Sequence, residues 1–480
     1  MSASSNTELK VLGKDDTDLV RAVRQQVIDD RRGSLEFRAE PPIRVMVRLL
    51  QQIERACEAR GFDPDIVRAE VVNRTIGDVN TRTVDECLGE PGGPLDYRTL
   101  ADDLGIALPG ERISGSTASG TTYLWLREEM QRQERALLAQ GHDLRLYDIN
   151  AIGNPVLRGW LAADAQGWGL DATAEQVALG IGANDCIDKV LRGLVQESRM
   201  AGTAAGAVAF PGPGFNMPEV QADFYGFRLS RITTRPDDGF RVTAGMLDRH
   251  LQDNPDVRAV YLAVANNPTA RLYPADELHA IRQVLLGHAT PAHPVHLLVD
   301  LAYIGTADPA LDQPSLRALA ARPQPGESII YVGSYSKTHT LTGDRFGWVV
   351  FSDPALAVDM RAGWMSTVST LPAEWQLRFM AYHRLFVSRP GVLDKVRGLY
   401  RLRRRRLRDQ LERLDRDHVF LDSIYPDDDS TIYVWCRLRP GHDCYTVLAR
   451  TGIAGIPGST FGYSDDHVRF SVGTLPVPGR

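Results

Sequence analysis

The chain has 480 residues, of which 43% are apolar and 24% are charged, and its formal net charge is −6. This length allows two or three domains with substantial cores, and the acidic balance gives no reason to expect a nucleic-acid partner. No apolar run approaches the roughly 20 residues of a membrane span, and residues 1–10 lack the apolar core of a signal peptide. Five scattered cysteines without a C-x-x-C pair predict reduced thiols, no metal site and a cytoplasmic protein.

Residues 1–120 are predicted to form an N-terminal extension of helices and loops. Helical periodicity covers residues 18–29 and 43–59, and glycine, proline and hydroxyl residues dominate 88–121. The simplest interpretation is an arm that packs on the body or on a partner subunit, and the alternative is a cover that restricts substrate access. Residues 1–115 carry 16 basic and 21 acidic side chains, a balance of 16 − 21 = −5, which is the wrong sign for DNA contacts.

After a helix predicted at 121–140, short apolar strands alternate with helices, which is typical of a mostly parallel sheet with crossover helices. The strands are predicted at 176–179, 204–210, 260–264, 295–299 and 329–332. Polar residues follow the last three strands: Asn267, Asp300 and the segment around Lys337. Open parallel sheets bind ligands at the carboxyl edge of their strands, so we expect these residues to share one site.

The most informative stretch runs from Ser334 to Gly347 and reads Ser-Tyr-Ser-Lys-Thr-His-Thr-Leu-Thr-Gly-Asp-Arg-Phe-Gly. Only five of the 55 basic residues are lysines, and one of them, Lys337, stands here. Lysine can lose its proton when partly buried and can then act as an amine nucleophile, which arginine cannot do. The planar guanidinium of Arg345 suits bidentate contact with a phosphate. The stretch therefore indicates a nucleophilic lysine beside an anion.

A glycine loop, residues 180–184, precedes a helix predicted at 185–195. Unpaired N–H groups at a helix N-terminus suit a phosphate, although the glycines could serve only a tight turn.

Together these motifs resemble the pyridoxal-phosphate (PLP) enzymes of the aspartate aminotransferase superfamily, fold type I, aminotransferase class I/II. The matching pattern is Ser-x-Ser-Lys followed by Gly-x-Arg-x-Gly, with the arginine eight positions after the lysine. The resemblance covers about residues 145–475. It implies an α/β fold with a large, mostly parallel α/β/α domain at 121–370 and a smaller C-terminal α+β domain at 371–480.

The resemblance also implies roles for particular residues. Lys337 would form the Schiff base with PLP, and Asp300 would contact the protonated pyridine nitrogen. Asn267 and Tyr303 would bind the 3-oxygen of the cofactor, and Phe215 would stack on its ring. Arg469 would bind the substrate α-carboxylate, and Tyr147 would contact a phosphate in the partner subunit. The residues implied to hold the cofactor phosphate are Gly182, Ala183, Asn184, Ser334, Ser336 and Arg345. Each residue type also has a purely structural use, such as a core aromatic for Phe215, a turn residue for Asn267, a helix cap for Asp300 and an edge-strand residue for Arg469.

The resemblance implies transamination of an L-amino acid, with Lys337 as the base at Cα, in an expected homodimer. Elimination, replacement or cyclisation, for example on S-adenosylmethionine, is the alternative within the same scaffold. A PLP-sensing transcription regulator is the remote alternative. His339 could shuttle a proton or simply pack in its loop. The arginine run 403–406, on a helix predicted at 373–414, is interpreted as a solvated or interface face.

Overall fold

The computed structural model of the chain describes residues 14–32, 42–79, 124–290, 292–368 and 370–473. These residues group into two compact units. The larger unit lies within Asp78–Leu407, Pro426–Tyr433 and Val472–Arg480, and the smaller unit lies within Met1–Gly77, Arg408–Tyr425 and Val434–Ser471.

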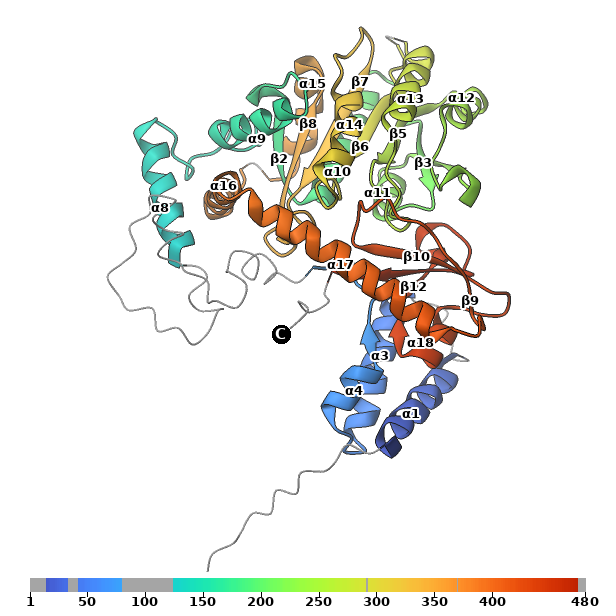
Figure 1. The fold of residues 1–480 in the computed structure, drawn as a ribbon. Coiled ribbons are helices and arrows are strands. Elements are labelled where there is room, and N and C mark those ends of the chain that lie inside the picture. The colour runs from blue at the N-terminus through green and yellow to red at the C-terminus, as the bar shows by residue number, and fades with distance from the viewer. Residues whose placement is uncertain (1–13, 33–41, 80–123, 291, 369, 474–480) are drawn as a thin grey trace, which may run out of the picture. The chain divides into compact units, whose positions relative to one another are not determined.

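A seven-stranded sheet forms the centre of the larger unit, with the spatial order β2-β8-β7-β6-β5-β3-β4 (Figure 1). Every neighbouring pair is parallel except those of β8, which is antiparallel to both β2 and β7. Six strands therefore direct their carboxyl ends to the same edge. The strands are β2 (Val177–Ile181), β3 (Ala207–Gly212), β4 (Arg228–Thr233), β5 (Val257–Ala263), β6 (His296–Asp300), β7 (Ser328–Ser334) and β8 (Phe346–Phe351).

The central strands are apolar on both faces because helices cover both sides, as parallel sheets require. On one face, α10 (Ala183–Met200) and α15 (Pro354–Met365) share a hydrophobic core with the sheet, which includes Val190, Trp364 and Ile330. The predicted α/β fold with a large, mostly parallel sheet is confirmed.

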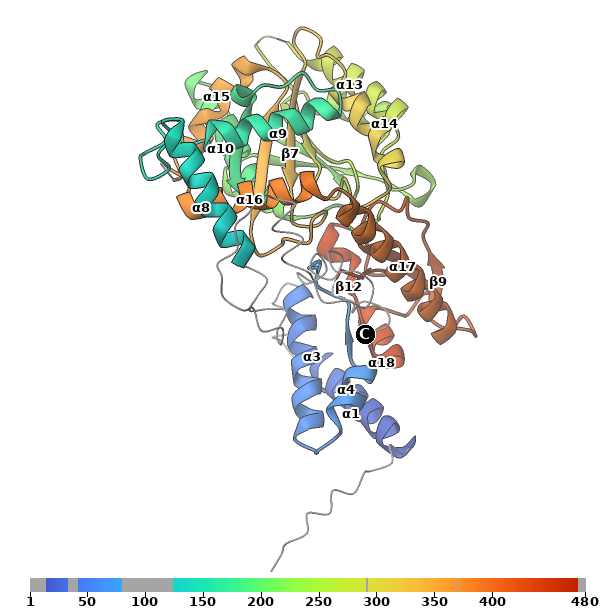
Figure 2. The same cartoon turned by 60° about the vertical axis from the view of Figure 1, so that its left-hand side comes forward.

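Helices α13 (Ala275–His288) and α14 (Pro309–Ala320) pack together and cover the opposite face (Figure 2). The hydroxyl of Tyr331 on β7 donates to the carbonyl of Leu319 in α14 at 2.7 Å. Other elements of this unit are α8 (Leu124–Ala139), α9 (Pro155–Gly167), α11 (Met217–Phe224), α12 (Ala244–Asp253), α16 (Ala373–Ser388), and the 3₁₀ turns η1 (Ala174–Gln176) and η2 (Pro236–Asp238).

The smaller unit contains a four-stranded sheet of order β12-β13-β10-β9 and a two-stranded pair, β1 with β11. Its strands are β1 (Val72–Asn73), β9 (Leu421–Ile424), β10 (Tyr433–Leu438, whose first residue belongs to the larger unit), β11 (Ile453–Ala454), β12 (Ile456–Pro457) and β13 (His467–Ser471). Its helices are α1 (Lys14–Arg32), α3 (Pro42–Glu58), α4 (Pro64–Glu70), α18 (Cys444–Thr451) and the 3₁₀ turn η3 (Gly458–Phe461).

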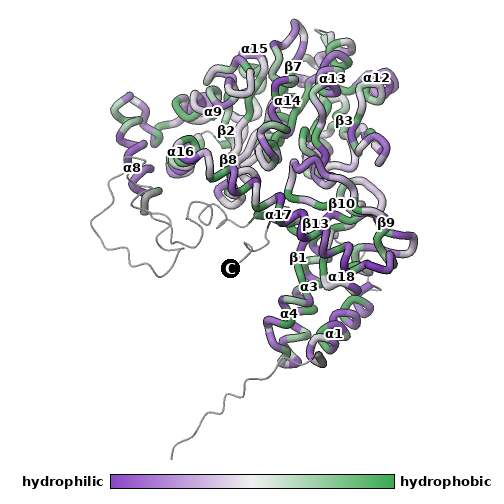
Figure 3. The backbone as a smooth tube through the Cα atoms, viewed as in Figure 1, coloured by the Kyte–Doolittle hydropathy of each residue, from purple (hydrophilic) through white to green (hydrophobic). Residues whose placement is uncertain are grey.

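The described N-terminal residues group with C-terminal residues, and this division differs from the predicted boundary at residue 120. Backbone hydrogen bonds join Val72 N to Gly452 O at 2.7 Å and Arg74 N to Ala454 O at 3.0 Å. Helix α3 is amphipathic, with alternating green and purple segments in Figure 3, and it buries one stripe of apolar side chains. Residues 80–123, which include the whole predicted loop-rich stretch 88–121, lie outside the described residues.

Two details of the predicted C-terminal helix were wrong. The stretch 373–414 is two helices, α16 and α17 (Gly391–Leu414), because Pro390 cannot continue the first one. The arginine run is not a uniformly solvated face: Arg403 and Arg404 are 0% and 2% exposed, whereas 405 and 406 are exposed. A four-residue run spans a full helical turn, so part of it faces inward.

Across the residues that the structure describes, none of the helices is both long and apolar enough to cross a membrane.

Candidate active site

The predicted site residues of the larger unit follow the carboxyl ends of neighbouring strands. Gly182 follows β2, Asn267 lies four residues past β5, Asp300 ends β6 and Ser334 ends β7. The strand register aligns Asp300 with the last residue of β5 and with a residue two positions before Ser334 on β7. Because adjacent strands lie about 4.8 Å apart, this edge gathers the predicted residues into one region.

Gly182, Arg345 and Gly347 form a close-packed backbone turn at this edge. Gly182 adopts φ +83°, and a Cβ placed on it would overlap the Arg345 guanidinium. A Cβ on Gly347 would meet the backbone of Gly182. Arg345 itself has φ +59°, a strained backbone for a side-chain-bearing residue, and its Nη1 donates to Thr342 O at 3.0 Å. The turn therefore brings a guanidinium directly against bare backbone.

The same turn opens helix α10, whose N-cap is Gly182 and whose first residues include Ala183 and Asn184. No side chain caps this helix, so N–H groups of its first turn are available to a ligand. An 18-residue helix also concentrates positive potential at this end. The Arg345 guanidinium adds a full charge, and the arrangement suits a phosphate.

Lys337 stands in a tightly hydrogen-bonded turn after β7. The Ser334 hydroxyl donates to the Ser336 hydroxyl at 2.8 Å and accepts from Ser336 N at 3.0 Å. The Lys337 carbonyl accepts a 2.9 Å hydrogen bond from the hydroxyl of Tyr400 in α17. Lys337 is half-buried, whereas Ser334 and Ser336 are buried. The turn fixes the backbone of Lys337 and leaves part of its side chain accessible.

His339 packs under this turn. Its ring stacks on Tyr335, with centroids 3.7 Å apart, and meets Phe386 edge-on at 4.4 Å. Burial lowers the pKa of the His339 imidazole well below its usual value, so the ring stays neutral. This environment fits the packing interpretation of His339 rather than that of a proton shuttle.

Asp300 is a buried carboxylate with two hydrogen bonds. The Tyr261 hydroxyl donates to Oδ2 at 2.5 Å, and Ala302 N donates to Oδ1 at 2.8 Å. Burial raises the pKa of the Asp300 carboxyl, and the two hydrogen bonds oppose that rise. A positive charge beside it would favour the ionised form, as a protonated ring nitrogen does. Asp300 thus fits the predicted contact to the cofactor ring.

Tyr303 lies three residues beyond Asp300, and its hydroxyl is 2.7 Å from the hydroxyl of Tyr433. The two rings meet edge-to-face, with centroids 5.5 Å apart. Asn267 is buried, and Phe215 is half-buried three residues past β3. The neighbouring Asn266 side chain donates to Pro213 O at 2.9 Å, which ties the loop of Asn267 to the loop of Phe215.

Arg469 lies on β13 of the smaller unit. Its side chain is 4% exposed, its Nη2 donates to the carbonyl of Thr75, and its guanidinium lies 4.9 Å from the centre of the Phe461 ring. Tyr147 belongs to the larger unit and is 82% exposed. Its neighbour Asp148 is fixed by a 2.8 Å hydrogen bond from its N–H to the Thr370 hydroxyl.

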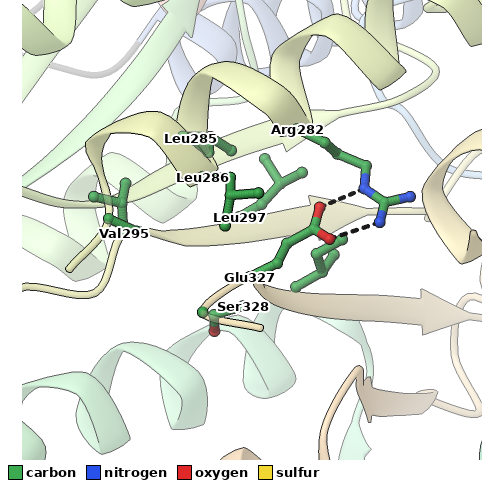
Figure 4. A pocket seen from close by; sticks show the side chains of 10 residues that line it. Arg282, Leu285, Leu286, Val295, Leu297, Glu327 and Ser328 are labelled. Carbon is green, nitrogen blue, oxygen red and sulfur yellow. Dashed lines mark hydrogen bonds and ion pairs between the residues drawn. The ribbon is translucent and has the colours of Figure 1, made fainter. Parts of the chain in front are cut away.

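A small pocket elsewhere in the larger unit is unrelated to these residues. Arg282 and Glu327 form a buried ion pair on its wall, and Leu297 and Ser328 also line it (Figure 4). Leu297 and Ser328 stand near the beginnings of β6 and β7, so the pocket lies at the amino edge of the sheet. The candidate active site lies at the opposite edge.

Sequence reasoning missed tyrosines that contact predicted site residues, among them Tyr261, which bonds Asp300, and Tyr433, which bonds Tyr303. Tyr261 lies within a buried, mostly apolar strand, Val257–Ala263, where a hydroxyl needs a partner, and this was the available signal. Tyr433 gave no such signal, because its partner is 130 positions away in the chain.

The family model for aminotransferase class I and II matches residues 127–476. The chain belongs to this family. Enzymes of the family use PLP, and this chain is a PLP-dependent transferase of the aminotransferase type. The resemblance inferred from the Lys337 motif is thereby confirmed.

Characterised relatives agree with this assignment. The chain is 26% identical over 318 residues to a valine–pyruvate aminotransferase of Mycobacterium tuberculosis, covering 65% of this chain and 74% of that protein. It is 28% identical over 191 residues to a histidinol-phosphate aminotransferase of Halorubrum lacusprofundi, covering 39% and 44%. An aspartate aminotransferase structure from Thermotoga maritima has the same fold, with a TM-score of 0.59 and 16% identity over 89% of this chain and 92% of that one.

The residues present fit the cofactor. The bare backbone of Gly182 lets the Arg345 guanidinium lie against the start of α10, and the guanidinium and the helix N-terminus together supply positive charge for a phosphate. The buried Asp300 carboxylate suits a protonated ring nitrogen, and the half-buried Lys337 is the amine of the Ser-x-Ser-Lys motif.

Proposed function

We propose that this aminotransferase transfers the amino group of an L-amino acid to a 2-keto acid, with Lys337 as the catalytic base at the substrate Cα. The observation that supports this most strongly is the combination of a half-buried lysine and a buried carboxylate, Asp300, past adjacent strands. Bound PLP supplies an electron-withdrawing ring that stabilises negative charge developing at Cα.

The protein side chains then take distinct roles. The Lys337 amine takes the Cα proton and delivers it to the position of C4′ of the cofactor. Burial beside a cationic ring favours the neutral amine, which can accept this proton. The Asp300 carboxylate holds a proton on the ring nitrogen. Asn267 and Tyr303 bind the 3-oxygen, and Phe215 packs on the ring face. The phosphate-binding groups are Gly182, Ala183, Asn184, Ser334, Ser336 and Arg345.

Arg469 is proposed to bind the substrate α-carboxylate. A guanidinium binds a carboxylate with two parallel hydrogen bonds, which fixes the orientation of the Cα–H bond. The Phe461 ring and the Thr75 carbonyl restrict the Arg469 side chain and reduce the entropy lost on binding. An Arg469→Lys variant is expected to raise KM for the amino acid at least tenfold and to leave the cofactor affinity unchanged.

The experiment that tests the reaction type uses the PLP-loaded protein and a panel of amino acids without an acceptor. Transamination releases one keto acid per active site and then stops until a keto acid acceptor is added. Continuous release of ammonia or of a cyclic product without an acceptor would instead identify elimination or cyclisation. Lys337→Ala is expected to lose the reaction, and the exposed Lys395→Ala is the matched control.

We further propose a homodimer in which Tyr147 contributes to the site of the other subunit. Leu146, Tyr147 and Ile149 are 68%, 82% and 86% exposed, an apolar segment that a second copy would cover. Mixing inactive Lys337→Ala and Tyr147→Ala proteins, after dissociation and reassociation, is expected to restore activity, because the hybrid dimer has one site with both residues. Failure of this complementation would contradict the cross-subunit role. A cytoplasmic location remains a prediction.

A further inference from the structure

The Tyr303–Tyr433 hydroxyl pair links a proposed cofactor contact to a residue without an assigned role. Tyr433 is 1% exposed, and its hydroxyl lies 2.7 Å from that of Tyr303. A buried hydroxyl must be hydrogen-bonded, because leaving it unpaired would cost stability. In such a pair one phenol donates its proton and the other accepts.

The segment that carries Tyr433 is firmly attached to the loops that follow β5 and β6. The Thr306 hydroxyl donates to Ser430 O at 2.6 Å, and the Ser430 hydroxyl donates to Ala270 O at 3.0 Å. Tyr433 N also donates to the Thr431 hydroxyl at 3.1 Å. Residues 430–433 therefore lie in a fixed position relative to the loop of Tyr303.

The buried Arg404 fixes the same segment from α17. Its guanidinium donates to the carbonyl of Thr431 and forms an ion pair with Asp429. Its Nε lies 3.7 Å from the Asp427 carboxylate. A buried arginine anchored to backbone and carboxylates has a defined orientation, so it helps to fix residues 427–431, which lead to Tyr433.

We propose that Tyr433 is a positioning residue for the reaction: its hydroxyl donates to the Tyr303 oxygen and so directs the Tyr303 proton toward the 3-oxygen of PLP. The inference rests on the proposed function, since it takes Tyr303 to be a ligand of that oxygen. A phenol that accepts a hydrogen bond becomes a stronger donor, because hydrogen bonds in a chain polarise one another. Tyr433 thereby favours negative charge on the 3-oxygen without touching the cofactor.

The test is a pH titration of the visible absorbance of the PLP-loaded protein, together with equilibrium dialysis of PLP. A donor to the 3-oxygen stabilises its anionic form, so removal of that donor raises the pH midpoint. Tyr433→Phe is expected to raise the midpoint by about half a pH unit, and Tyr303→Phe by more. Tyr331→Phe is the matched control, since its buried hydroxyl bonds Leu319 O away from the site and the midpoint should not move.

The double variant decides whether Tyr433 acts through Tyr303. If it does, Tyr303→Phe combined with Tyr433→Phe gives the same midpoint and the same PLP dissociation constant as Tyr303→Phe alone. An unchanged midpoint in Tyr433→Phe, or a shift that adds fully to that of Tyr303→Phe, would overturn the inference. If the wild-type protein shows no PLP-dependent visible band, the proposed function itself fails, and the two failures are thus distinguishable.

Discussion

Gly182 and Arg345 lie so close together that a Cβ on the glycine would overlap the guanidinium. Gly182 also has φ +83°, a conformation that side-chain-bearing residues rarely adopt. This pair defines the proposed phosphate site, where bare backbone and one cation meet at the start of α10. A side chain at this position would therefore strain the backbone and would push the Arg345 guanidinium away from the start of α10.

Replacing Gly182 with alanine is expected to weaken PLP binding about tenfold to a hundredfold, because the added methyl group displaces Arg345 and strains the backbone. Equilibrium dialysis of PLP measures the effect. Gly343→Ala is the matched control in the same motif, since a Cβ there would meet nothing within 4 Å, and its affinity should change by less than about twofold. Equal losses in both variants would contradict the role of the Gly182–Arg345 contact.

Replacing Asp300 with asparagine is expected to lower kcat on the order of a hundredfold, because the neutral amide no longer holds a proton on the ring nitrogen. Tyr261→Phe removes only the hydroxyl that donates to Asp300 and should lower kcat much less. Steady-state kinetics with a keto acid acceptor measure both. A Tyr261→Phe loss as large as that of Asp300→Asn would mean that the hydroxyl, rather than the carboxylate charge, is the essential group.

The buried Asp312 carboxyl is expected to make the free energy of unfolding depend on pH. Burial raises the pKa of its carboxyl to about 6, and Gly305 N, in the loop of Tyr303, donates to it at 2.7 Å. A raised carboxyl pKa means that the folded state binds the proton more tightly than the unfolded state, whose pKa is about 4. The contribution of Asp312 to the free energy of unfolding therefore falls as the pH rises from about 4 to about 6.

Asp312→Asn removes this titration and keeps an oxygen that can accept from Gly305 N. Relative to wild type, the variant is expected to gain ~2–3 kcal/mol between pH 4 and pH 7. Urea unfolding of both proteins at several pH values measures the difference. A difference that stays constant across this range would show that Asp312 does not titrate there.

Neighbouring arginines of the run 403–406 differ in their surroundings: Arg404 is buried, whereas Arg405 is exposed. Arg404→Ala is expected to lower the free energy of unfolding by about 1–3 kcal/mol, because Thr431 O loses a buried donor and Asp429 keeps only its ion pair with Arg401. The exposed Arg405→Ala should change it by less than about 0.5 kcal/mol. Urea unfolding of the two variants under identical conditions provides the comparison, and similar values for both would contradict the burial of Arg404.

Local sequence determined the motif around Lys337, the buried strands β2, β3, β5, β6 and β7, and hence the fold and the cofactor. These features depend on spacing and apolar runs within short stretches, which a single sequence displays directly. The roles of the individual site residues remain predictions, although the strand ends bring Gly182, Asn267, Asp300 and Ser334 to one edge.

The tertiary structure alone decided the pairings between residues far apart in the chain. Tyr433 meets Tyr303 across 130 positions, and Arg404 is buried because residues 427–431 return to it. The described residues before 78 group with C-terminal residues, and β1 pairs with β11. Such contacts leave no periodic trace in the sequence, since each depends on a single approach of two segments that the fold brings together.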